Sequence, residues 1–476
     1  MQLKKALWGN LVYTAVQFTL PLITMVFLAH VLGASAFGEL SWVEGFCRLL
    51  GLLFSMGIPL YGPKALMQCD NDHERKVVFN GLLRIHLAIV LLMILVVVFY
   101  FKGLRWDGFL PWPWIYLLSQ VFQLEWFFQG TQRFDFVIKR SLFVRSAALL
   151  AVCFFVRGPE DVYLGFKILA TTQWVLGIFN VWHLRNEIDL TFNTVVHKNR
   201  TWIKPVIWIC ISSLCITGYT LLDTVILGSY SNSLEVGNYS VAIRIAKLPM
   251  LIMGAFVSMV VLKLTSIKST GSVSDFENLL EKSFKSLMMV ILPITILLAS
   301  LPEVWIDLVG GPTFFNGADI LRIVAWILPL MVLSNVFGFQ VLITMNKERY
   351  YMYVSIGGLI VSLISFFIFI PLWGATGAAV GILVTEFTVA CLAIFSSRNL
   401  IKVGKLLPFA IYWTLFLIPI YFLLVYLGRV IDSKILLCVL SSITMILYCL
   451  FITYFVFKER WCFRWISSTW CHLISS

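Results

Sequence analysis

The chain has 476 residues, of which 60% are hydrophobic and only 13% are charged. A soluble domain carries about 25% charged residues, so this much apolar surface cannot be hidden inside a water-soluble fold. Together with the net charge of +12, these values exclude a soluble enzyme, a DNA-binding protein or a disordered tail as a description of the whole chain. They predict an all-α polytopic membrane protein.

Fourteen stretches are apolar enough to be membrane-spanning helices, which need about 20 mostly apolar residues. The first runs on from a short basic start without a cleavage site, so it is kept as a helix and not as a leader. The longest outer joint, 302–318, is too short to house a catalytic domain. The predicted spans lie near residues 8–32, 41–61, 82–101, 111–130, 141–156, 162–184, 204–228, 239–262, 284–301, 319–343, 351–371, 374–396, 406–428 and 435–457.

The distribution of Lys and Arg predicts the orientation of these spans. With the N-terminus inside, 25 of the 36 basic residues fall in inner segments, Arg140 among them, and only 5 fall in outer segments. Positive residues stay on the cytoplasmic side, so both termini are predicted to be cytoplasmic. The basic residues then set the orientation of the spans and attract anionic lipids, and no nucleic-acid partner is expected.

Motifs for cofactor or metal chemistry are absent from the sequence. It contains no GxxxxGK[ST] phosphate loop, no HExxH and no CxxC, and its six histidines are scattered. No metal, cofactor or catalytic residue is therefore predicted. A transporter with this sequence would be driven by an ion gradient or by the gradient of its own substrate.

Two similar turns indicate an internal repeat. FGELS at 37–41 follows a Leu-Gly pair at 32–33, and VGNYS at 236–240 follows a Leu-Gly pair at 227–228. This alignment makes Arg48 equivalent to Lys247. Because many transporters are built from repeated helix sets, it predicts an N-terminal lobe of six spans at 1–200, a second lobe at 201–400, and two further spans with a cytoplasmic tail at 401–476.

Ionisable residues inside the predicted spans are the candidates for function, because each costs about 2.5–3.5 kcal/mol near the bilayer centre. Glu44 and Arg48 share a helical face, as do Arg244 and Lys247, and both basic faces fall in the outer half of the membrane. The candidates for a cationic cavity are Arg48, Arg244, Lys247, Arg322 and Arg145. The candidates for coupling to H⁺ or Na⁺ are Glu44, Glu125, Asp223 and Glu386.

Each candidate also has a structural interpretation. Glu44 and Arg48 can form an ion pair that only neutralises itself, and Arg322 and Arg145 can extend toward a nearby interface. Glu125 and Glu386 can be hydrogen-bonded structural acids, and Asp223 can be the anion that balances Arg244 and Lys247. If the basic faces instead meet, they form a cationic cavity that suits a phosphate or pyrophosphate.

The N-terminal motifs resemble those of a known family. Asn10, the turn that joins Leu32-Gly33 to Phe37-Gly38, and GIPLYGPK at 57–64 are similar to the start of Wzx-type polysaccharide transporters. These are O-antigen flippases of the multidrug/oligosaccharidyl-lipid/polysaccharide exporter (MOP) superfamily. The resemblance covers the layout of the first twelve spans and is specific over residues 9–66. Many members have an Arg before the Leu-Gly turn; here His30 and Val31 precede it, so a role for that Arg does not transfer.

The resemblance implies two six-helix lobes around a central cationic cavity that opens alternately to each side. The implied substrate is an undecaprenyl-pyrophosphate-linked oligosaccharide, which moves from the cytoplasmic to the periplasmic leaflet of a bacterial inner membrane. Membrane lipids and the O-antigen polymerase and chain-length machinery are the implied partners. A lipid II flippase is a close relative that differs in the sugar it carries.

Two other functions compete with this one. A drug/cation antiporter of the same superfamily would take substrates that are often cationic, which fits poorly with Arg and Lys inside the membrane. An O-antigen polymerase or ligase would be a membrane enzyme with a large outer loop, and no such loop is predicted.

Overall fold

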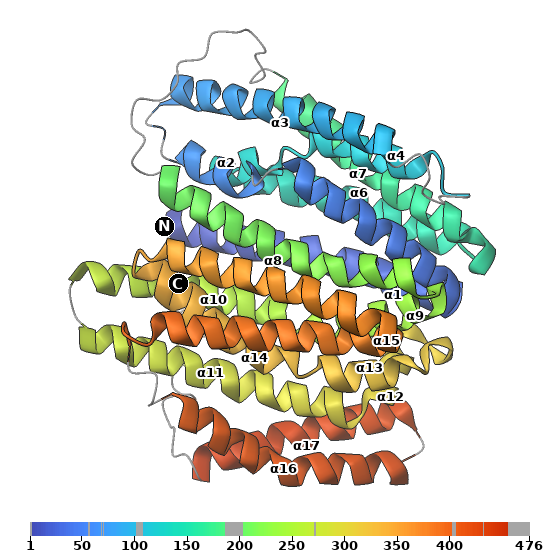
Figure 1. Cartoon of the computed structure of the whole chain (residues 1–476), viewed down its shortest axis with the longest axis vertical. Coiled ribbons are helices and arrows are strands. Elements are labelled where there is room, and N and C mark those ends of the chain that lie inside the picture. The colour runs from blue at the N-terminus through green and yellow to red at the C-terminus, as the bar shows by residue number, and fades with distance from the viewer. Residues whose placement is uncertain are drawn as a thin grey trace. The chain divides into compact units, whose positions relative to one another are not determined.

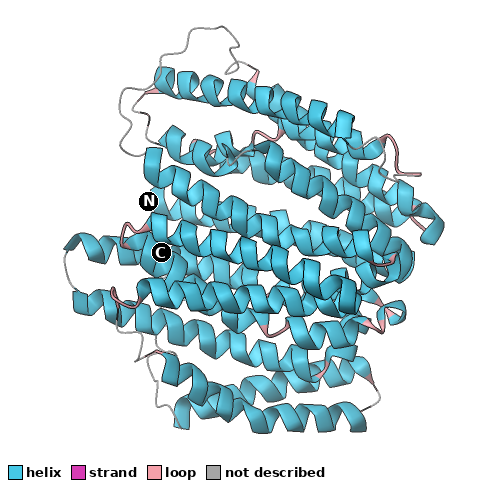
Figure 2. Ribbon diagram, viewed as in Figure 1, coloured by secondary structure: helices cyan, strands magenta, loops and turns pink. Residues whose placement is uncertain are grey.

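A computed structural model describes residues 2–455, except for 56–57, 68, 70, 101–107, 186–202, 271–272, 402–405 and 432. Every regular element in these residues is a helix (Figure 2), which confirms the predicted all-α class. The cytoplasmic tail predicted at the C-terminus lies beyond residue 455, outside the described residues. The side of the membrane on which each terminus lies stays a prediction.

Eight helices in the described residues are long and apolar enough to cross a membrane, so the chain is a multi-pass membrane protein. Two of them, α1 (Gln2–Ser55) and α15 (Glu348–Ser397), are each divided by a glycine with positive φ. The φ angles are 72° at Gly33 and 54° at Gly374, a region that glycine adopts without steric cost. Each of these long elements is therefore two helices in succession, and the total of fourteen spans stays a prediction.

The chain forms two compact units. The first comprises Met1–Val241, Val309–Phe314 and Glu348–Thr385, and the second comprises Ala242–Leu308, Phe315–Lys347 and Glu386–Ser476. The lobes at 1–200 and 201–400 were inferred from the sequence repeat, and they stay a prediction.

Helix α1 organises the first unit. It packs along α6, α7 and α8, while α2 packs on α5 and α4 on α7 (Figure 1). The other helices of this unit are α2 (Ile58–Met67), α3 (Asp72–Tyr100), α4 (Trp112–Ser119), α5 (Glu125–Gly130), α6 (Phe134–Phe155), α7 (Val162–Leu184), α8 (Ile203–Tyr230), most of α9 (Ser233–Lys247) and the greater part of α15.

The span predicted at 111–130 is not one helix, which corrects the sequence interpretation. A 3₁₀ turn (Gln120–Phe122) follows α4, and the chain leaves helical geometry before α5 begins. Two polar side chains of α7 bind this segment. Gln173 Oε1 accepts from the side-chain Nε2 of Gln123 at 3.1 Å. Asn180 Nδ2 donates to the backbone carbonyl of Phe122 at 3.0 Å and so compensates for the break. Backbone groups without helical partners inside a membrane need such replacements.

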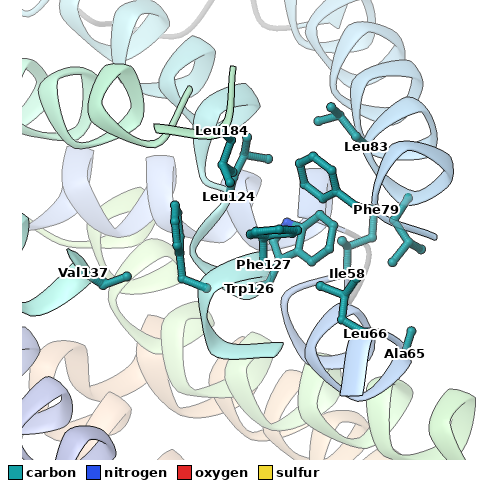
Figure 3. Close-up of a cluster of buried hydrophobic side chains, with 12 residues drawn as sticks. Ile58, Ala65, Leu66, Phe79, Leu83, Leu124, Trp126, Phe127, Val137 and Leu184 are labelled. Carbon is teal, nitrogen blue, oxygen red and sulfur yellow. The ribbon is translucent and has the colours of Figure 1, made fainter. Parts of the chain in front are cut away.

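A buried apolar cluster fixes the short helix α5 (Figure 3). At its centre the Phe79 ring of α3 lies 4.5 Å from the Phe127 ring and 5.4 Å from the Trp126 ring of α5, measured between centroids. Ile58 and Leu66 of α2 complete this side of the cluster. Because α5 begins at Glu125, the same packing sets the position of that carboxylate.

The glycines aligned by the sequence repeat pack against each other's helices. A Cβ on Gly38 would lie 1.7 Å from the carbonyl oxygen of Ser233, and a Cβ on Gly237 would lie 2.0 Å from that of Ala34. The backbones of α1 and α9 are therefore in direct contact where they cross, and no larger residue fits at either position. Gly38 and Gly237, which the sequence repeat aligns, therefore both lie at the crossing of α1 and α9.

In the second unit, α11 packs against α10, α14, α16 and α17. The elements of this unit are α10 (Met250–Thr270), α11 (Val273–Ser300), most of α12 (Pro302–Gly310), α13 (Gly317–Val324), α14 (Ile327–Leu333), a π-helix (Ser334–Ile343), α16 (Leu407–Val430) and α17 (Lys434–Phe455).

Three sequence predictions in this part of the chain are corrected. The outer joint at 302–318 is not a plain loop, because it contains α12. The span at 239–262 is divided between α9 and α10 at Pro249, whose missing N–H cannot continue the helical hydrogen bonds. The span at 319–343 consists of α13, α14 and the π-helix.

Candidate functional site

The glutamate and arginine predicted to share a face of the second span form an ion pair. An Oε1 of Glu44 lies 2.7 Å from an Nη2 of Arg48, both on α1. The Glu44 side chain is 5% exposed, whereas that of Arg48 is 47% exposed. A buried carboxylate therefore anchors an arginine that still presents about half of its surface. An arginine on a membrane helix is found facing a water-filled space or a partner and not lipid.

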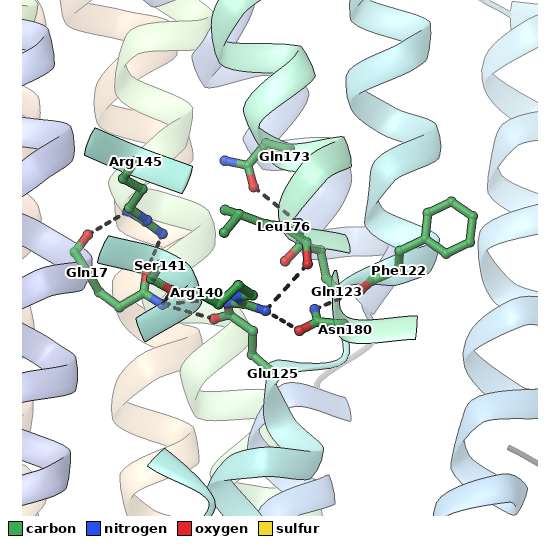
Figure 4. A network of polar contacts seen from close by, with 10 residues as sticks. All are labelled: Gln17, Phe122, Gln123, Glu125, Arg140, Ser141, Arg145, Gln173, Leu176 and Asn180. Carbon is green, nitrogen blue, oxygen red and sulfur yellow. Dashed lines mark hydrogen bonds and ion pairs between the residues drawn. The ribbon is translucent and has the colours of Figure 1, made fainter. Parts of the chain in front are cut away.

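A second polar cluster lies among α1, α5, α6 and α7, with Arg140 at its centre (Figure 4). The Arg140 side chain is 1% exposed and forms an ion pair with Glu125. It also donates to Asn180 Oδ1 and, at 3.4 Å, to the carbonyl of Leu176. All three partners come from neighbouring helices, so this guanidinium links α5 and α7 to α6.

Arg140 was assigned to an inner connecting segment from the sequence, and the structure corrects this. It lies on α6 within a buried stripe that also contains Val137, Ser141 and Val144. These positions repeat at i, i+3, i+4 and i+7, the spacing of one helical face. The spacing was a usable signal, but the predicted span began at residue 141, one residue too late to include Arg140.

Gln17 of α1 joins two of the predicted candidates. Its Nε2 lies 3.3 Å from Oε2 of Glu125 and 3.5 Å from Oγ of Ser141. Its Oε1 and its backbone carbonyl both accept from the guanidinium of Arg145, the carbonyl at 2.8 Å. The structure thus brings Glu125 and Arg145 together through a glutamine that the sequence reasoning missed, since an uncharged polar residue in an apolar span carries no charge signal.

Asp223 of α8 is buried and accepts hydrogen bonds from uncharged groups. The hydroxyl of Tyr239 on α9 donates to Oδ2 at 2.7 Å, and the amide and hydroxyl of Thr224 donate to Oδ1 at 2.5 and 3.0 Å. Among the described residues of the first unit, none of the Lys or Arg side chains pairs with it. Asp223 is therefore a buried carboxylate that hydroxyl and amide donors stabilise, in a helix apolar enough to cross a membrane.

The remaining candidates belong to the second unit. Arg244 and Lys247 occupy the last turn of α9 and are both partly buried; the negative end of a helix dipole favours cations there. Glu386 is buried on α15. Arg322 differs, because Glu303 and Asp319 bind its guanidinium at 2.7 and 2.8 Å on an exposed surface. The predicted meeting of Arg48 with Arg244 and Lys247 in one cavity stays a prediction.

A family model described as "Polysaccharide biosynthesis protein" matches residues 3–262, which is more than half of the chain. The chain belongs to this family. It is 24% identical over 414 residues to a protein of Escherichia coli (strain K12) named "Putative O-antigen transporter", covering 83% of this chain and 98% of the relative. The predicted resemblance to the polysaccharide transporter family is thereby confirmed.

Two solved structures of MOP transporters have a fold similar to that of this chain. The lipid II flippase MurJ in an inward closed conformation matches with a TM-score of 0.65 at 13% identity, covering 94% of this chain and 99% of MurJ. An inward-facing multidrug resistance MATE family transporter of the MOP superfamily matches with a TM-score of 0.63 at 13% identity, covering 82% and 95%. At these identities the likeness concerns the fold.

Proposed function

We propose that this protein is a flippase for a lipid-linked oligosaccharide with an anionic headgroup. In the form that the sequence resemblance implies, it moves undecaprenyl-pyrophosphate-linked repeat units from the cytoplasmic to the periplasmic leaflet of a bacterial inner membrane by alternating access. Membership of a polysaccharide biosynthesis family supports the substrate class. The relatives reported above are named as transporters or a flippase, in agreement with the prediction that the chain is not an enzyme.

The observation that carries the choice of an anionic substrate is the half-exposed Arg48 at membrane depth. Glu44 fixes the guanidinium from its buried side, and the exposed side is presented for a second anion. Arginine binds phosphate oxygens with two parallel hydrogen bonds. Lys247, which the repeat makes equivalent, forms no hydrogen bond or ion pair with described residues and supplies a point charge. A cationic drug would be repelled by both groups.

The contacts of the other basic candidates reduce the set of residues proposed to bind the headgroup. Two carboxylates already occupy Arg322 on an exposed surface, and Gln17 occupies Arg145. Arg48 and Lys247 are therefore the proposed headgroup residues, and Arg244, which lies one turn from Lys247 on α9, is kept with them from the sequence prediction. Among the acidic candidates Glu44 and Glu125 have arginine partners, whereas hydroxyl and amide donors bind Asp223. We therefore assign coupling to H⁺ or Na⁺ to Asp223 in the first place. Glu386, which is buried on α15, is kept from the sequence prediction as the candidate of the second unit.

The decisive experiment replaces the proposed headgroup residues in cells that depend on this gene. Lys247→Gln is the cleanest variant, because no carboxylate is left without its partner; Arg48→Gln is combined with Glu44→Gln for the same reason. A charged hydrogen bond is worth about 1.5–3 kcal/mol, which corresponds to about ten- to a hundredfold in Kd. Arg322→Gln is the matched control.

We expect gene deletion to accumulate a single-repeat lipid intermediate facing the cytoplasm and to lose surface polymer. Lys247→Gln and the Glu44→Gln/Arg48→Gln pair should do the same while the variant proteins are present at normal abundance. Arg322→Gln should make normal polymer. Unchanged polymer in the deletion strain would favour drug export, and repeat units stranded on the outer face would favour a polymerase. Normal polymer in the headgroup variants alone would refute the assignment of these residues.

A further inference from the structure

The first helix contains a proline whose consequences can be traced atom by atom. Pro21 lies inside α1, and its nitrogen carries no hydrogen. In an α-helix the N–H of each residue donates to the carbonyl four residues earlier, so the carbonyl of Gln17 has no helical donor. In the hydrocarbon core water cannot replace that donor, and an unsatisfied carbonyl is costly.

A guanidinium from another helix supplies the missing donor. Arg145 of α6 donates through Nη1 to the carbonyl oxygen of Gln17 at 2.8 Å. Its second terminal nitrogen donates to Oε1 of the same glutamine. Both donors of one planar fork therefore serve one residue, the residue that Pro21 deprives of its helical hydrogen bond (Figure 4).

The same glutamine passes the connection to the buried ion pair. Gln17 Nε2 lies 3.3 Å from Oε2 of Glu125, and Glu125 pairs with Arg140. The opened turn of α1 is thus joined to α6 by Arg145 and to α5 by Glu125. A substitution at Arg145 would release the carbonyl and the side chain of Gln17 together.

A carbonyl close to a proline in the second unit also accepts a hydrogen bond from a neighbouring helix. Pro419 lies inside α16, and in the turn before it the carbonyl of Phe416 accepts from the hydroxyl of Tyr448 on α17 at 2.7 Å. In both units a side-chain donor from a neighbouring helix thus binds a carbonyl beside a proline, although at Pro419 the carbonyl is three residues earlier and not four.

We propose that Arg145 is a positioning residue that holds the proline-opened turn of α1, and that it does not bind the substrate. Transport should respond to this role because α1 also carries Arg48. Only that transport measurement rests on the proposed function. The fork of Arg145 fixes the turn at Gln17, and the turn fixes the direction in which α1 continues from Pro21. The contact of Arg145 with the carbonyl of Gln17 is therefore needed because residue 21 is a proline, whereas its contact with Oε1 of Gln17 does not depend on Pro21.

This dependence gives a rescue experiment. Arg145→Met removes the charge and all donors but keeps an unbranched side chain. Pro21→Ala restores an N–H that can donate to the carbonyl of Gln17. We expect Arg145→Met to lower the midpoint of thermal unfolding of the purified protein and its transport per molecule, and Arg145→Met/Pro21→Ala to recover more than half of each loss. Arg145→Met/Pro371→Ala, which removes a proline of α15, should recover neither.

A headgroup ligand would behave differently. If Arg145 bound the substrate, Arg145→Met would lose transport with an unchanged unfolding midpoint, and Pro21→Ala would not restore it; that result would overturn the inference. Should Arg145→Met fail to fold, Arg145→Lys replaces it in the same comparison, since one ammonium cannot reproduce the fork. The unfolding midpoints decide the question even if the protein proves not to be a flippase.

Discussion

Replacing Arg140 by methionine should destabilise the first unit far more than replacing a surface arginine. The substitution leaves the carboxylate of Glu125 without its cation and Oδ1 of Asn180 without the donor that Arg140 provides. Removing one partner of a buried ion pair costs about 3–5 kcal/mol. Because the Glu125 side chain is 22% exposed, we expect the lower end of that range, about 3 kcal/mol.

The contribution of Glu125 can be separated by a second substitution. In Arg140→Met/Glu125→Gln no charge remains unpaired, but Asn180 still has an acceptor without a donor, which costs about 1–3 kcal/mol. The double variant should therefore be more stable than Arg140→Met and less stable than the wild type. Arg75→Met breaks an exposed pair with Asp72, and exposed pairs are worth about 0–1 kcal/mol, so it is the control.

The measurement is reversible unfolding of the purified proteins in mixed micelles, followed by helical circular dichroism as the fraction of denaturing detergent rises. The free energy of unfolding should fall in the order wild type, Arg75→Met, double variant, Arg140→Met. A stability of Arg140→Met equal to that of Arg75→Met would refute the assignment of Arg140 to a buried network. A double variant no better than Arg140→Met would show that Glu125 does not depend on this arginine.

Two further predictions concern the crossing of α1 with α9 and the buried carboxylate of α8. Gly38→Ala should abolish the folded protein, because its Cβ would overlap a backbone oxygen, whereas Gly81→Ala, where nothing lies within 4 Å, should be tolerated; size-exclusion chromatography distinguishes the two. Asp223→Asn should retain the hydrogen bond from Tyr239 but remove the charge, and transport should lose its dependence on an applied ion gradient. Tyr239→Phe keeps the carboxylate, so its transport should still depend on the ion gradient. Equal dependence on the gradient in the wild type, Asp223→Asn and Tyr239→Phe would contradict the assignment of Asp223.

The sequence predicted the helical class, the long apolar helices and the family because these depend on composition and local motifs. Apolar stretches of sufficient length locate membrane helices without any knowledge of neighbours. The breaks were harder to predict. The interruption before Glu125 depends on α7, where Asn180 donates to the opened backbone at Phe122 and Gln173 binds the side chain of Gln123. Residues 111–130 alone do not indicate these contacts.

The candidate residues could be named from their charges, but their partners could not be predicted in the same way. The Glu44–Arg48 pair was predictable since both residues lie on one helix at i,i+4. Arg145 and Gln17 are 128 positions apart, and their contact depends on how α1 packs against α6. Arg140 was missed because the predicted helix began too late, although the spacing of its buried neighbours indicated the correct face.

The number of donors that the protein itself uses distinguishes the roles of the predicted arginines. A guanidinium has five donors, and when neighbouring oxygens occupy its two terminal nitrogens, as at Arg145 and Arg322, its binding capacity serves the fold. Arg48 is different, because Glu44 of its own helix and Tyr116 of α4 bind it while about half of the side chain remains exposed. At membrane depth such exposure would be costly if it met lipid. An arginine that its neighbours hold in place and that is still about half exposed is therefore the one best suited to meet an anionic headgroup.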